Sequence, residues 1–118
     1  MATGMIPCPA MLVQLWVNPN PTSSFAAQTV SVDLSKYRWI VITAKQQSDT
    51  SSDMSIATLV EVGVSSQLSI PNVGSTQYFY KRSITTSSSG VTFTTGYRNT
   101  SGTAATSYCI PMAIYGLC

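Results

Sequence analysis

The chain has 118 residues, enough for one domain with a sizeable hydrophobic core. Charged residues make up 8% of it, against roughly 25% in ordinary soluble domains. The net charge is +2 and no basic run exceeds Lys81-Arg82, so the basic stripe that nucleic-acid binding needs is missing. A surface this poor in charge gives little repulsion between copies, so we expect a homo-oligomer that works inside an assembly.

Cysteine usage and the N-terminal residues suggest where the protein is made. Cys8, Cys109 and Cys118 are an odd, widely spaced set in a chain without histidine, which argues against zinc. We expect free thiols in a reducing cytoplasm, with one disulfide as the alternative. Residues 1–11 are expected to form an N-terminal arm, and they lack the basic start of an export signal. No apolar run approaches the roughly 20 residues of a membrane span.

Apolar residues recur with a period of two, which is typical of strands. We expect strands over Leu12 to Val17 and Val30 to Leu34, separated by Asn18-Pro19-Asn20-Pro21, whose prolines cannot join a strand ladder. Trp39 to Ala44 is apolar or β-branched at every position. We therefore expect a central strand there, either covered on both faces or with one face against a neighbouring subunit.

The second half of the chain continues the same pattern between turn-rich segments. Polar loops are expected over Gln46 to Asp53 and Gly96 to Ala105, and a turn over Pro71 to Gly74. Further strands are expected over Met54 to Val62, Leu68 to Ile70, Thr76 to Thr86, Val91 to Thr95 and Ser107 to Tyr115. Pro111 lies inside the last of these, so that strand should lie at an edge or carry a bulge.

This succession defines the fold class. About eight short antiparallel strands with no sustained helical spacing predict an all-β domain spanning residues 1–118, either a β-sandwich or a jelly-roll-like barrel.

The inventory for catalysis is thin. Without histidine, acid-base chemistry would fall to Asp33, Asp49, Asp53, Glu61, a lysine or a tyrosine. Asp49 and Asp53 share one loop, but such loops commonly carry carboxylates for solvation, and their spacing matches no calcium loop. We expect no catalytic site, no metal and no cofactor, and so no enzyme.

The aromatic residues offer another role, because tyrosine and tryptophan rings stack on sugars and anchor protein interfaces. Most of them should fill the core. Two polar loops nevertheless suit ligand or receptor contact, and the candidate residues are Tyr97, Arg98, Asn99, Gln47, Asp49 and Asp53. Side chains of these types favour a neutral, hydroxyl-rich partner such as a surface glycan.

Both ends of the chain carry motifs that permit a comparison. Leu15-Trp16-Val17-Asn18-Pro19-Asn20-Pro21 runs on through Phe25 and Gln28 to Val30, and the chain closes with Ile110-Pro111-Met112-Ala113-Ile114-Tyr115-Gly116. These motifs resemble small virion-associated proteins and fibre or baseplate end domains of tailed bacteriophages and prophages of gut and Firmicutes bacteria. The resemblance leaves residues 45–99 free to vary and brings no catalytic residues with it. It implies a trimer.

Composition and resemblance together predict a bacteriophage virion structural protein, made in the host cytoplasm and released by lysis. Variable polar loops favour a tail-tip, fibre or receptor-binding component that contacts other virion proteins and a host-surface glycan. A capsid decoration or minor structural protein is the first alternative. A free-standing carbohydrate-binding module is the second, although it would not explain the missing export signal.

Overall fold

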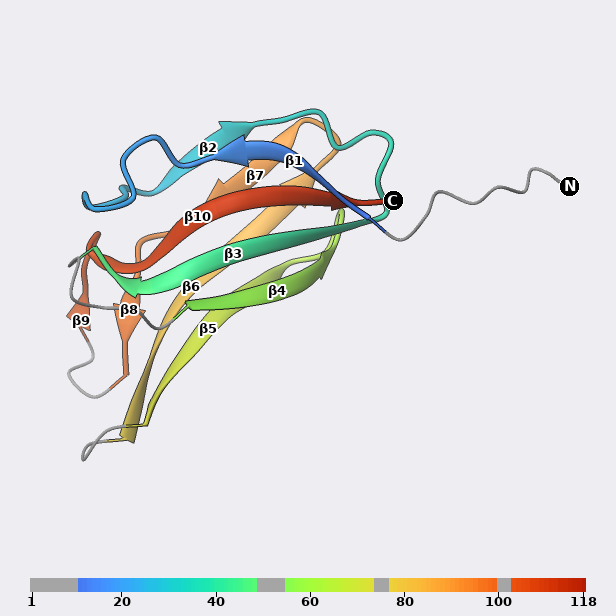
Figure 1. Cartoon of the computed structure of the whole chain (residues 1–118). Helices are drawn as coiled ribbons and strands as arrows, with labels where there is room; N and C mark the ends of the chain where they lie inside the picture. Colours follow the sequence, from blue (N-terminus) through green and yellow to red (C-terminus); the bar gives the residue numbers. More distant parts are fainter. Residues whose placement is uncertain (1–10, 49–54, 74–76, 100–102) are drawn as a thin grey trace, which may run out of the picture.

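A computed structural model describes residues 11–48, 55–73, 77–99 and 103–118. Within these ranges the chain is all-β, and its strands form two antiparallel sheets packed as a sandwich (Figure 1). The predicted fold class is therefore confirmed, in its sandwich form. No segment in the described ranges forms a helix able to cross a membrane.

The strands follow the predicted order with changed bounds. They are β1 (Leu12–Val17), β2 (Gln28–Ser31), β3 (Trp39–Gln47), β4 (Ser55–Glu61), β5 (Ser66–Val73), β6 (Gln77–Ser87), β7 (Gly90–Phe93), β8 (Tyr97–Arg98), β9 (Thr103–Ala104) and β10 (Tyr108–Leu117). Four predictions change. The expected turn at Pro71 is still part of β5, and the expected loop from Gly96 to Ala105 contains β8 and β9. Gln46 and Gln47, expected in a loop, belong to β3, and the strand expected to reach Leu34 ends at Ser31.

The first sheet has the order β1-β10-β3-β4, so the first and last strands of the chain are neighbours. In the second sheet β2 pairs with β7, β7 with β6, and β5 with the other edge of β6. β8 continues along the β7 side of β6 and pairs with β9. Pro71 lies on β5, which pairs only with β6 among the described strands, and an edge strand tolerates a residue without a backbone N–H.

The hydrophobic core lies between the sheets and follows the alternation of the strands. β3 contributes Ile40, Ile42 and Ala44, all fully buried, while the residues between them are half-exposed. The expectation that β3 is covered on both faces is thus wrong for this chain alone, because no segment of the described protein packs on its outer face. On β6, Tyr80, Arg82 and Ile84 point into the core.

Pro111 lies in the last strand, at a bulge. β10 runs between β1 and β3, so of the two predicted positions the edge is wrong and the bulge is right: Pro111 pairs with Ala44 and Ala113 with Thr43, leaving Met112 as the extra residue. The buried Asn18 binds the carbonyl groups at this bulge. Its backbone N–H donates to the Met112 carbonyl, and its side-chain amide donates to the Pro111 carbonyl.

Two of the three cysteines lie in the described residues. Cys109 is a buried free thiol with a positive φ of 52°, and it precedes the bulge on β10. Cys118 is disulfide-bonded, so the expectation of free thiols throughout is wrong for this residue. Cys8 lies outside the described residues.

Candidate functional site

The candidate site is built on the β8 end of the sandwich, opposite the C-terminus (Figure 1). Gly96 makes this end possible: a side chain there would place its Cβ 2.1 Å from the Tyr108 carbonyl oxygen. The Gly96 carbonyl accepts a hydrogen bond from the Ala105 N–H at 2.9 Å. A glycine therefore lets the chain leave β7, form the short β8–β9 pair and return to β10 in close contact.

The structure brings together the candidate residues that it describes. We call their neighbourhood the β8 surface, and it consists of Gln47, Phe79, Lys81, Tyr97, Arg98 and Asn99. Tyr97 and Arg98 form β8 and pair with Lys81 and Tyr80 of β6. Gln47 joins from the first sheet, because its amide donates a 2.6 Å hydrogen bond to the Tyr80 hydroxyl. Asp49 and Asp53 lie outside the described residues.

Asn99 has a structural role that the sequence did not indicate. Its side-chain oxygen accepts a 2.7 Å hydrogen bond from the Phe79 N–H, and its own N–H donates to the Phe79 carbonyl. Asn99 thus extends the pairing of β8 with β6 beyond Arg98. The side-chain oxygen of Asn99 already accepts this hydrogen bond, so a ligand would contact the side-chain NH₂ group.

Two cations lie over aromatic rings in this surface. The Lys81 ammonium is 5.0 Å from the ring centre of Tyr97 and 6.0 Å from that of Phe79. The Arg98 guanidinium is 5.3 Å from the ring centre of Tyr108, which packs against Tyr80. Because directly opposed residues share a face, Lys81 and Tyr97 lie on the outer face of the second sheet, whereas Arg98 lies on the inner face with Tyr80. This end of the sandwich therefore presents rings, amides and one cation on each face of β8.

Arg82 lies beneath the β8 surface and is fully buried. A guanidinium has five N–H donors, and all five meet backbone carbonyls: those of Phe25, Thr94, Thr106, Tyr108 and Cys109. Burial lowers the Arg82 pKa to about 10, and the group stays charged at neutral pH. Because four of its five partners flank the β8–β9 segment, Arg82 fixes both ends of the segment that carries the surface.

From the sequence alone, Arg82 was considered only as one of the basic residues, without a structural role. The signal that could have found it is its position between Tyr80 and Ile84 on the apolar face of a strand, where a cation must find several acceptors.

The two other acidic residues, Asp33 and Glu61, make local contacts away from the candidate site. Asp33 accepts hydrogen bonds from the hydroxyl and backbone N–H of Ser35, which hold the pKa of its carboxyl below the ordinary value. Glu61 pairs with Arg38. Neither belongs to the β8 surface. In the described ranges no three His, Cys, Asp or Glu side chains are grouped to hold a metal.

A polar groove, separate from the β8 surface, lies between the edge strands β1 and β2. It is lined by Trp16, Asn18, Pro19, Asn20, Ser24, Phe25, Gln28, Val30 and Ser31, none of which is charged. Most of the N-terminal motif therefore lines this groove.

Comparisons with models of known protein families, with curated proteins and with solved structures found no match to this chain.

Proposed function

We propose that this chain is a structural protein of a bacteriophage virion, and that it acts there as a tail-tip, fibre or receptor-binding component in host adhesion. The motifs at both ends of the chain support the virion context. The observation that carries the adhesion role is the β8 surface, where rings, amides and cations from β3, β6 and β8 gather at one end of the sandwich. The C-terminus lies at the other end (Figure 1), so one end can attach while the other contacts a target.

The proposed target is a glycan of the host cell surface. Tyrosine rings stack on sugar faces, and the amides of Gln47 and Asn99 pair with hydroxyl groups. A single shallow site of this kind binds with a dissociation constant of about 1 mM, equivalent to roughly −4 kcal/mol. Several copies on one particle raise the avidity by about two to four orders of magnitude without any new contact, which suits a homo-oligomer.

Lys81 and Arg98 make the charge of this glycan testable. A neutral glycan gives binding that changes little with salt, whereas an acidic one would engage the two cations and weaken as salt increases. The same surface gives no support to catalysis, and we propose that the protein is not an enzyme.

Two alternatives rest on other observations. A capsid decoration or minor structural role needs only sites for other virion proteins, and the exposed apolar residues Leu12, Val17 and Leu59 suit it. A free-standing carbohydrate-binding module is favoured by the uncharged groove between β1 and β2, which contains Trp16.

Immunogold electron microscopy of purified particles tests the proposed function. Antibody against the chain should label the tail tip or fibres of particles released by lysis. Label over the head would support decoration instead. Particles without label, with the protein recovered free in the medium, would contradict the virion assignment.

A further inference from the structure

The outer face of the first sheet is apolar, although the outer face of an antiparallel sandwich is normally polar. Directly opposed residues of antiparallel strands share a face, so the registers define rows of side chains across it. One row contains Leu12, Leu117 and Trp39, and the next contains Tyr115, Val41 and Leu59, with the polar Gln14 at its β1 end. Leu12 is 51% exposed, Leu59 55% and Trp39 36%. We call these rows and the one beside them the apolar face.

The second sheet provides an internal comparison. Its equivalent row, across β2, β7 and β6, is Thr29, Thr92 and Thr85, and the first two share a hydrogen bond of 2.8 Å between their hydroxyls. Both sheets therefore bury one face in the same core, yet only the second has a hydrated outer face. The composition of the chain as a whole does not account for this difference, because it applies to both sheets.

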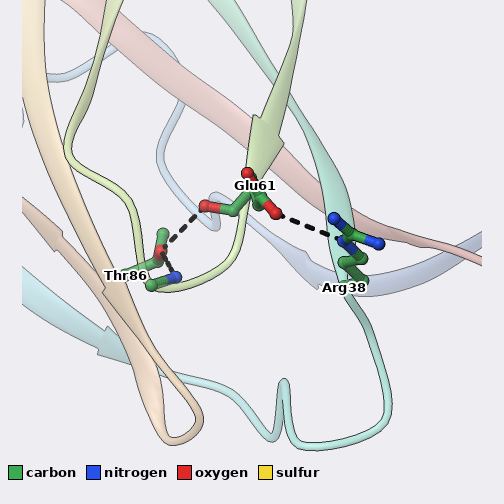
Figure 2. Close-up of polar contacts among 4 residues, drawn as sticks. Arg38, Glu61 and Thr86 are labelled. Atoms are coloured by element: carbon green, nitrogen blue, oxygen red, sulfur yellow. Dashed lines mark hydrogen bonds and ion pairs between the residues drawn. The ribbon is translucent and has the colours of Figure 1, made fainter.

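Charge is almost absent from the apolar face. Glu61 ends the Trp39 row, and its carboxylate is paired with the Arg38 guanidinium at 3.2 Å, as Figure 2 shows. The Glu61 backbone carbonyl is also held, by the Thr86 hydroxyl of the second sheet. Lys45 follows Thr43 on the same face of β3 and has no ion pair among the described residues, but it lies beyond the three rows. Within the rows no charge is left unpaired, so the partner of this face must be similarly apolar.

We propose that the apolar face packs against the same face of a second copy of this chain. The third row supplies the shape for this pairing over β10, β3 and β4, where its side chains Ala113, Thr43 and Ala57 are small; on β1 the row ends at the larger Val17, which is 49% exposed. A two-fold axis that runs across the strands at the Val41 row places the large row of each copy over the small row of the other. Trp39 then meets Thr43, Leu117 meets Ala113, and Leu59 meets its own counterpart, as an isologous interface requires.

The size of the face fits a pair of copies. Four strands about 4.8 Å apart and six residues of about 3.3 Å each give roughly 19 by 20 Å, or roughly 400 Å² of projected area per copy. Side-chain relief and the rim then bring the total close to the roughly 1,000 Å² that a specific interface needs. The inference rests on the homo-oligomer of the proposed function, names the face it uses, and predicts an even number of copies rather than the trimer that the resemblance implies.

Sedimentation velocity over a wide concentration range tests the pairing with two matched variants. Leu59→Asp introduces a charge at the apolar face on the edge strand β4, and Thr29→Asp introduces the same charge on the edge strand β2 of the other sheet. We expect the parent to dimerise, Leu59→Asp to weaken dimerisation by about tenfold or more, and Thr29→Asp to leave it unchanged. Circular dichroism melts verify that both variants fold.

A second measurement leaves the apolar face unaltered. In a Trp16→Phe background, Trp39 is the remaining tryptophan, and its emission should shift to longer wavelength on dilution as the pair separates. A parent that is monomeric at every concentration overturns both this pairing and the homo-oligomer, and implies that another virion protein covers the face. An oligomer equally stable in both Asp variants, or one with three copies, overturns the pairing alone.

Discussion

At the scale of single residues, Arg82 determines how the β8 end is held. A buried guanidinium usually has a carboxylate partner, but here five backbone carbonyls from separate segments share the charge. The Phe25 ring also lies 5.4 Å from the guanidinium carbon. Phe25, Thr94 and Thr106 lie outside the strands, and Tyr108 and Cys109 begin β10, before the part of that strand that pairs with β1. Arg82 therefore stabilises the departures from regular pairing that the site requires.

Replacing Arg82 should lower the free energy of unfolding far more than replacing its neighbour Lys81. Arg82→Met leaves five carbonyls without their donor, and we expect the free energy of unfolding to fall by about 4 kcal/mol. Arg82→Lys should recover only part of this, because an ammonium has three donors. Lys81→Met, one residue away on the outer side, should cost less than about 1 kcal/mol. Urea unfolding midpoints of the three variants give the comparison, and equal losses at positions 81 and 82 would refute this role.

Cys109 should make stability depend on pH in the alkaline range. Burial raises the pKa of its thiol to about 12, whereas the unfolded chain ionises near 9.0. The folded state therefore keeps a proton that the unfolded state loses, so the free energy of unfolding should fall as the pH rises from 9.0 towards 12. Cys109→Ala should show a shallower decline over that range. Identical pH profiles for parent and variant would mean that the thiol contributes nothing.

At the scale of elements, the sequence pattern predicted the strands that depend on local alternation and missed those that depend on distant contacts. β1 was predicted with its bounds, and β6 and β7 were predicted as separate strands with a break between Thr86 and Val91, because alternation is a property of short stretches. β8 and β9 have two residues each, too few for any alternation, and they exist through contacts of Gly96 and Asn99 with distant backbone. The bulge at Met112 likewise depends on pairing with β3.

The candidate site divides in the same way. Tyr97, Arg98, Asn99 and Gln47 were predicted as contact residues from their polar segments, and the structure places them at one end of the sandwich, with Tyr97 and Arg98 on opposite faces of β8. Their supports could not be predicted, because the Arg82 acceptors and the Asn99 partner are backbone groups, which are identical in every sequence. The functions of these residues remain predictions.

The β8 segment itself gives an element-scale prediction. Gly96→Ala would force a Cβ against two backbone carbonyls, at 2.1 Å from Tyr108 and 2.8 Å from Ala105, so the segment must move. We expect a loss of about 2 kcal/mol in stability together with loss of cell binding. Gly63→Ala is the matched control: its φ is +93° but nothing lies within 4 Å of the added Cβ.

The control separates stability from binding. Gly63→Ala should cost about 1 to 2 kcal/mol through backbone strain and leave cell binding intact. If both variants bind cells like the parent, the position of β8 does not matter for adhesion.

At the scale of the whole molecule, the sandwich has surfaces of different chemistry: an apolar outer face on the first sheet, a hydroxyl-bearing outer face on the second, and the β8 surface at one end. Such a division suits a component that is fixed in a particle on one side and exposed on another. Low overall charge fits the same picture, because copies held side by side do not repel each other.

Binding of the assembled protein to host cells tests the adhesion role most directly. Fluorescently labelled parent should bind cells of the bacterium that supports the phage, and binding should fall about tenfold or more in Tyr97→Ala and in Arg98→Ala. Asn99 is unsuitable for this test, since its side chain holds the Phe79 backbone. Thr29→Ala, an exposed change on β2, which does not pair with β8, should bind like the parent. Undiminished binding by both β8 variants, with their oligomeric state and melting unchanged, would contradict the assignment of adhesion to this surface.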